Sequence, residues 1–188
     1  MTTPLSETDE KAQDALRARQ GRGARYDAPA APHGALLLAR RGAAFFSRKL
    51  NELTDLELDG QSARDGLSRR QIVSDVCLSA RAMAIAIKSM RVGLSEDEEA
   101  WQPNMPMTVT LPARALRFLY THSDIHLNVE FRDLSSSQWD MSVDLNGPTP
   151  MRDLPMKRAR ALWFGALDLN AGALVSALPE PFRQERAP

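Results

Sequence analysis

The sequence predicts a mainly α-helical protein, a four-helix bundle with a short β-strand or hairpin before the last helix. Four stretches carry apolar residues at alternating three- and four-residue steps, which is the spacing of one helical face. Between the third and fourth stretches, apolar and polar residues alternate over residues 139–145, and Asn146-Gly147-Pro148 then predicts a turn. Helices with one apolar face bury it against each other, so we expect a bundle.

The two ends of the chain are expected to lie outside this bundle. Residues 1–34 combine Thr, Ser, Gly, Pro and charged residues with few large apolar side chains, which predicts a flexible tail over residues 1–26. Within it, residues 11–25 could form a short arginine-rich helix. Proline and charge dominate the other end of the chain, so we expect the bundle to span residues 27–172 and a second tail to span residues 173–188.

The first two helices are predicted over residues 35–55 and 68–91. The inward face of the first consists of Leu36, Ala39, Ala43, Phe46, Leu50 and Leu53. A connection containing Gly60 and Gly66 follows, and Ser68 is placed to cap the second helix. The inward face of the second helix consists of Ile72, Val76, Ser79, Met83, Ile87 and Met90.

Asp75 lies about 60° from the inward face of the second helix, where a side chain can enter a pocket between helices. The alternative is a half-exposed acid paired with an arginine, since acids are seldom buried alone. Cys77 lies about 200° from Asp75, so we interpret it as an inert thiol rather than a nucleophile. It is the single cysteine, which excludes an internal disulfide.

A loop is predicted over residues 93–110 and a third helix over residues 111–134. Glu130 falls within the apolar stripe of this helix, so its carboxylate should be paired or have a raised pKa. His126 lies one turn before Glu130, and His122 lies one turn earlier. We interpret these side chains as a hydrogen-bonded cluster or an acid/base pair rather than a metal site.

The fourth helix is predicted over residues 153–169, ending before Asn170-Ala171-Gly172. Its inward stripe consists of Ala159, Leu162, Ala166 and Leu169. A second row at helical spacing borders the core and consists of Arg158, Ala161, Gly165 and Asp168. A glycine inside a helix costs about 1 kcal/mol relative to alanine, so Gly165 beside Ala161 indicates open space at this place.

Two of these stretches have a characteristic form, MRDLPMKRARALWFGALDLNAG at residues 151–172 and GLSRRQIVSDV at residues 66–76. They resemble the metal-binding helices of the mycothiol-dependent maleylpyruvate isomerase family, a branch of the DinB-like helical bundles. The stretches at residues 35–58 and 111–139 resemble further helices of that family, so the likeness covers roughly residues 27–172. The resemblance implies a DinB-like four-helix bundle.

The metal-ligand positions of that family are substituted in this chain. The resemblance implies a divalent metal held by a Glu and a His on the last helix and by a His on an earlier helix. The matching positions here are Ala161, Gly165 and Asp75, and a single carboxylate cannot replace three ligands, so we expect no metal. In the family the metal holds the mycothiol thiol as a thiolate. We therefore expect no cofactor, with mycothiol kept as an alternative.

The overall charge excludes some partner classes. The chain has 24 Lys and Arg and 24 Asp and Glu, so no net field attracts nucleic acid or an anionic membrane. No apolar run approaches the roughly 20 residues of a membrane span, and residues 1–13 lack the features of a signal peptide. We therefore expect a cytoplasmic protein with a small-molecule ligand, and a homodimer stays open.

The preferred functional hypothesis is a metal-independent, repurposed enzyme of the isomerase type. It would isomerise or cyclise a small unsaturated or carbonyl metabolite, such as one of secondary metabolism, in a pocket between the bundle helices. Asp75 would act as the base, Glu130 with His126 as a second proton-transfer group, and Arg158 as an anchor for a carboxylate or enolate. The rest of the pocket is predicted to consist of Ser79, Ala161, Trp163, Gly165 and Asp168. The alternatives are a non-catalytic protein that binds a small molecule or a partner, and a mycothiol-dependent isomerase or thiol transferase.

Overall fold

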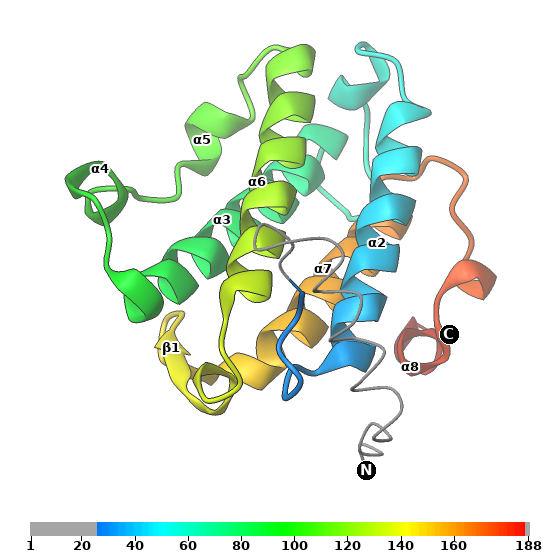
Figure 1. Cartoon of the computed structure of the whole chain (residues 1–188). Helices are drawn as coiled ribbons and strands as arrows, with labels where there is room; N and C mark the ends of the chain where they lie inside the picture. The colour runs from blue at the N-terminus through cyan, green and yellow to red at the C-terminus, as the bar shows by residue number, and fades with distance from the viewer. Residues whose placement is uncertain (1–25, 187–188) are drawn as a thin grey trace, which may run out of the picture.

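Four long helices form the frame of the protein in the computed structural model, which describes residues 26–186 (Figure 1). They are α2 (His33–Asn51), α3 (Arg69–Val92), α6 (Ala113–Asp133) and α7 (Leu154–Asp168). Helix α2 packs mainly against α7, and α3 packs mainly against α6 with a smaller contact to α7. The predicted mainly helical bundle is confirmed. The tail and short helix predicted within residues 1–25 lie outside the described residues.

The predicted inward faces of the long helices are buried in two core clusters that follow each other along the bundle. One cluster contains Phe46, Leu116 and Leu162, and the other contains Leu36 and Leu127. Each of these five side chains is at most 2 % exposed. None of the helices within residues 26–186 combines the length and the apolar character needed to cross a membrane.

Helix α3 begins where the sequence predicts, because Ser68 caps it. The Gln71 amide donates to Ser68 Oγ at 3.3 Å, and the Ser68 amide donates to Gln71 Oε1 at 2.8 Å. This reciprocal pair satisfies two amides at the helix start and fixes the direction in which the chain enters α3.

The hairpin predicted before the last helix is present and is shorter than the alternation of residues suggests. Strand β1 (Ser142–Asp144) pairs in antiparallel fashion with β2 (Pro148–Pro150). Asn146 and Gly147 have φ of 61° and 130°, the left-handed region that tight hairpin turns require. Trp139 does not belong to the strand. It lies in a 3-10 turn before β1 with its ring fully buried, because burying the indole favours the core over a strand position.

The segment between α3 and α6, predicted as a loop, contains two single-turn helices, α4 (Glu96–Glu99) and α5 (Met105–Thr108). Ser95 caps α4 together with Glu98, and Lys88 of α3 forms an ion pair with Glu98 at 2.7 Å. The acidic run is therefore the start of a helix, where the partial positive charge of the helix terminus favours carboxylates.

The segment after α7, predicted as a tail, packs against the bundle up to the end of the described residues. It contains α8 (Glu180–Arg183) between two 3-10 turns (Figure 1). Leu178 and Phe182 are 1 % and 2 % exposed and belong to one cluster with Trp163. The prediction of a tail therefore needs correction over residues 173–186, since two apolar side chains four residues apart suffice to attach the segment.

Candidate functional site

A cavity of about 370 Å³ opens between α3 and α7, at the place where the resemblance puts the metal of the family. Four of the predicted site residues line it, namely Asp75, Ala161, Gly165 and Asp168. Ile72 and Val76 of α3 and Phe164 of α7 form its apolar wall. The volume is within the range typical of sites for small metabolites.

Three cationic side chains that the sequence analysis missed line the same cavity. Arg64 comes from the turn before α3, and Lys157 and Arg160 come from α7. Lys157 lies one helical turn before Ala161, so the spacing that pointed to Ala161 would also have found it. With Asp75 and Asp168 as the acidic lining residues, cations outnumber carboxylates three to two in the lining itself, and Glu185 pairs with Arg160 from outside it.

The cavity edge is shaped by the segment that follows α7. The Arg160 guanidinium lies over the Phe164 ring, 5.1 Å from its centroid, and forms an ion pair with Glu185. The Asp75 carboxylate on the opposite wall is exposed to solvent, and no ion pair joins it to another residue between 26 and 186. The alternative of an arginine-paired Asp75 is therefore not observed in the described part of the chain.

The open space predicted directly at Gly165 is absent. A Cβ atom added there would lie 3.0 Å from Val76 Cγ2 and 3.1 Å from Phe46 Cε2. Hydrocarbon side chains therefore cover this glycine, and the cavity extends beside it along Asp75 and Ala161. Glycine occupies the position because α2, α3 and α7 approach each other closely here.

The residues at the family's ligand positions do not fit a divalent metal. Asp75 is the only one of the three with a donor atom, and cysteine or histidine is absent from the cavity lining. Among residues 26–186, no group of three or more His, Cys, Asp or Glu side chains could hold a metal ion. No reaction step through a metal is therefore derived for this site.

Arg158, predicted as a substrate anchor, does not line this cavity. Its side chain is 2 % exposed, and its guanidinium donates to the Val76 carbonyl at 2.7 Å and to Asp124 Oδ1 at 3.0 Å. It thereby connects α7 with α3 and α6 inside the bundle. Removing Asp124 would leave the buried charge of Arg158 uncompensated, so Arg158 and Asp124 are coupled within the helix packing.

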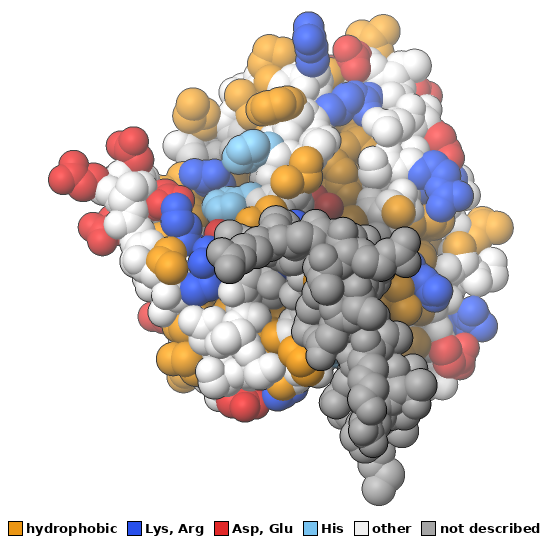
Figure 2. All heavy atoms as spheres, in the orientation of Figure 1, with side chains coloured by type: hydrophobic (Ala, Val, Ile, Leu, Met, Phe, Trp, Pro, Cys, Tyr) orange, Lys and Arg blue, Asp and Glu red, His pale blue; other side chains and the backbone are white. Residues whose placement is uncertain are grey.

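Glu130 and His126 lie together, as predicted, but on the other side of α3 from the cavity, in the interface with α6. Arg91 donates two hydrogen bonds to Glu130 Oε2, at 2.9 and 3.2 Å, and His126 Nε2 lies 3.6 Å from Glu130 Oε1. The prediction that this buried carboxylate is paired is confirmed. Burial lowers the pKa of His126, opposed by the charge of Glu130. Imidazole side chains lie beside Lys and Arg side chains on the face seen in Figure 2.

Three further side chains have structural roles. Trp163 Nε1 donates to the Leu38 carbonyl at 3.0 Å, so its ring packs toward α2 and away from Ala161. Ser79 donates to the Val76 carbonyl at 3.2 Å and is not part of the cavity lining. Burial raises the pKa of the Cys77 thiol to about 12, which agrees with the prediction of an inert thiol.

Two solved crystal structures are similar to this fold. The crystal structures of the mycothiol-dependent maleylpyruvate isomerase and of a mutant with one histidine replaced by alanine each superpose with a TM-score of 0.70 at 27% sequence identity. The aligned region covers 79% of this chain and 65% of those chains. No protein-family model and no curated protein sequence matches the chain. The chain thus has the DinB-like fold of the mycothiol-dependent maleylpyruvate isomerase, without a metal-binding cluster among residues 26–186.

Proposed function

We propose that the protein binds a small organic anion in the α3/α7 cavity, without a metal ion. The observation that carries the proposal is the set of three cationic side chains around this cavity, Arg64, Lys157 and Arg160. A guanidinium binds a carboxylate through two parallel hydrogen bonds, and an ammonium adds a mobile point charge. The apolar wall formed by Ile72 and Val76 supplies contacts for a short carbon skeleton.

Binding ranks above catalysis because the predicted catalytic groups do not share one cavity. The enzyme hypothesis places Asp75, the Glu130–His126 pair and Arg158 around one substrate. Arg158 and Glu130 are buried in helix interfaces with partners of their own, so Asp75 is the one predicted acid/base group left beside the cations.

A metal-independent isomerase-type enzyme is the second candidate, and two observations favour it. The fold is shared with an isomerase, and the Asp75 carboxylate lines the same cavity as the three cations. Isomerisation next to a carbonyl needs a base to remove a proton and a cation to stabilise the enolate oxygen. In this candidate Asp75 is the base, and Lys157 or Arg160 stabilises the enolate.

The mycothiol-dependent alternative would have to activate the thiol without a metal ion. Neighbouring cations lower the pKa of a thiol, and Arg64, Lys157 and Arg160 line the cavity. The carboxylates of Asp75 and Asp168 are weaker bases than a thiolate, so they would not remove its proton. Calorimetric titration with mycothiol tests the alternative directly, since a measurable heat of binding would restore it.

Isothermal titration with matched ligands tests the binding proposal. Succinate, maleate and pyruvate are compared with succinamide and maleamide, which have the same shapes without charge. We expect the anions to bind at least about tenfold more tightly, because each charge-assisted hydrogen bond contributes about 1.5 kcal/mol or more. Equal binding of anions and amides, or no binding of either, contradicts the proposal.

Variants locate the binding site. Lys157→Gln combined with Arg160→Gln should weaken anion binding by about tenfold or more, because two of the three cations are removed. Arg41→Gln combined with Arg114→Gln is the matched control, since both arginines are exposed, on α2 and α6, and neither lines the cavity. An equal loss in the control would show that the effect is one of overall charge.

Hydrogen exchange distinguishes the isomerase candidate from a binder. A keto acid that binds is incubated with the protein in D2O, and deuterium at the carbon beside the carbonyl is followed by NMR. The enzyme candidate predicts exchange that Asp75→Asn abolishes while binding is retained, with Asp97→Asn of α4 as the control. Binding without accelerated exchange leaves the binding function alone.

A further inference from the structure

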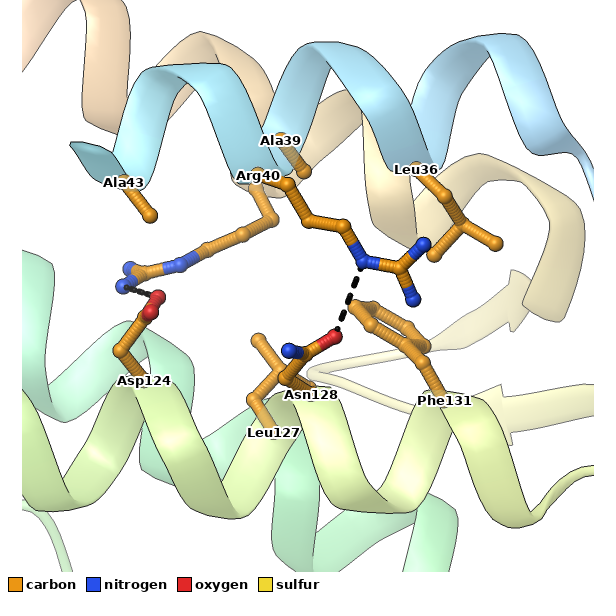
Figure 3. A pocket seen from close by; sticks show the side chains of 9 residues that line it. Leu36, Ala39, Arg40, Ala43, Asp124, Leu127, Asn128 and Phe131 are labelled. Atoms are coloured by element: carbon orange, nitrogen blue, oxygen red, sulfur yellow. Dashed lines mark hydrogen bonds and ion pairs between the residues drawn. The ribbon is translucent and has the colours of Figure 1, made fainter. Parts of the chain in front are cut away.

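A second cleft lies between α2 and α6, away from the α3/α7 cavity. Its inner end is a small cavity of about 30 Å³, and its outer part is a depression of about 300 Å³. The two share four lining residues: Arg40, Ala43, Asp124 and Asn128. They therefore form one continuous cleft, and Figure 3 shows its inner end with α2 above and α6 below.

The inner end contains a buried donor without a partner. Arg158 lines it with a side chain that is 2 % exposed, and both terminal nitrogens of its guanidinium are engaged by Val76 and Asp124. Its Nε is buried and has no hydrogen-bond partner in the described part of the chain. A buried N–H without an acceptor costs about 1–3 kcal/mol, so an oxygen atom placed here by a ligand removes that cost.

The charges of the cleft cancel each other. Arg158 is paired with Asp124 at 3.0 Å, and Arg40 is paired with Asp27 through contacts of 2.6 and 2.7 Å. The hydrogen bonds with Asp27 raise the pKa of Arg40. These pairs leave no charge of opposite sign in the cleft to neutralise an ionised ligand. A neutral ligand keeps both ion pairs intact.

The remaining surface of the inner end is apolar. Leu36 of α2 and Leu127 and Phe131 of α6 line it, and Figure 3 shows the three side chains converging between the two helices. A volume of about 30 Å³ is close to the share of one water molecule in the liquid, so it admits one oxygen-sized group. The body of a ligand must then lie in the outer depression.

We propose that this cleft is a second binding site for a neutral small molecule, whose carbonyl or hydroxyl oxygen accepts a hydrogen bond from the Arg158 Nε–H. The site does not depend on the α3/α7 cavity, because the two share no lining residue. It should therefore persist in the variant with Lys157→Gln and Arg160→Gln, in which anion binding is lost.

Three probes of similar shape test the chemistry of the site. Acetophenone carries a carbonyl oxygen, benzoate carries a charge, and ethylbenzene carries neither. The Arg158 Nε–H signal is followed in ¹H–¹⁵N spectra of the full chain and assigned by its loss in Arg158→Lys. Acetophenone should shift this signal and bind about tenfold more tightly than ethylbenzene or benzoate. Equal binding of all three, or acetophenone binding that leaves the signal unshifted, overturns the proposal.

Two variants block the cleft at separate places. Ala43→Leu narrows the part common to both cavities, and Asn128→Phe fills the mouth from an exposed position on α6, where folding should be unaffected. Each should reduce acetophenone affinity by about tenfold or more. Ala35→Leu on α2 is the matched control, since Ala35 lines neither cavity. Acetophenone binding that survives Asn128→Phe unchanged refutes the site.

Discussion

Replacing Gly165 with alanine tests whether the position that the resemblance matches to a metal ligand is open space or packed core. An added methyl group would lie 3.0 Å from Val76 Cγ2 and 3.1 Å from Phe46 Cε2. Phe46 is fully buried and Val76 is 3 % exposed, so neither side chain can move aside into solvent. Overpacking of this kind costs about 2 kcal/mol, while alanine gains about 1 kcal/mol over glycine in a helix. We therefore expect Gly165→Ala to lower the free energy of unfolding by about 1 kcal/mol.

Urea unfolding followed by far-UV circular dichroism measures this difference. Gly34→Ala is the matched control, because Gly34 lies in the first turn of α2 and a methyl group added there would have no atom within 4 Å. We expect this variant to raise the free energy of unfolding by up to about 1 kcal/mol. In a background with both Val76→Ala and Phe46→Leu the two crowding side chains are smaller, and Gly165→Ala should become neutral or stabilising. If Gly165→Ala in the wild-type background is as stable as Gly34→Ala, the space over Gly165 is open.

Three further predictions concern buried or paired groups. Arg91→Met should cost about 3 kcal/mol in urea unfolding by leaving the Glu130 carboxylate buried without its two hydrogen bonds from Arg91, and adding Glu130→Leu should recover most of that loss. Cys77, fully buried with a pKa raised to about 12, should react with a thiol reagent only as fast as the protein unfolds, and rapid labelling of the native state would contradict its burial. The hydrogen bond from the Lys88 ammonium group lowers the pKa of Glu98 from 4.5 to about 2. The stability that this hydrogen bond gives to the attachment of α4 is therefore present above pH 4.5 and is lost as the pH falls through about 2. The fluorescence of the nearby Trp101 should report this loss.

The helical frame could be predicted because each long helix repeats its apolar spacing over several turns. The inward stripe predicted for α7, Ala159, Leu162, Ala166 and Leu169, is fully buried. Short elements give no such repetition. The attachment of residues 173–186 depends on Leu178 and Phe182, and two apolar residues among prolines and charges do not form a pattern that a sequence alone reveals.

The candidate site was predicted in part, for a related reason. The family resemblance relates Asp75 to Ala161 and Gly165, helical spacing adds Asp168 to the same row, and all four line the cavity. The spacing does not tell whether a residue beside the stripe faces the cavity or the neighbouring helix. Arg158 and Ala161 are three residues apart on one row, yet Arg158 turns into the bundle toward Asp124. The direction of the Arg158 side chain depends on the Asp124 carboxylate of α6, and the spacing of residues within α7 carries no information about α6.

The fold does not depend on ligating side chains at the positions that the resemblance matches to metal ligands. Asp75 and Ala161 reach solvent at the cavity wall, so changing them alters little buried surface. The contacts that hold the helices together at this level are Phe46 and Val76 against Gly165, and the hydrogen bonds of Arg158 to α3 and α6. Phe46 and Val76 close over Gly165, so a side chain as large as histidine could stand at position 165 only if both became smaller. The same packing that holds the three helices together therefore keeps a ligating side chain out of this position, while the cavity beside it stays open.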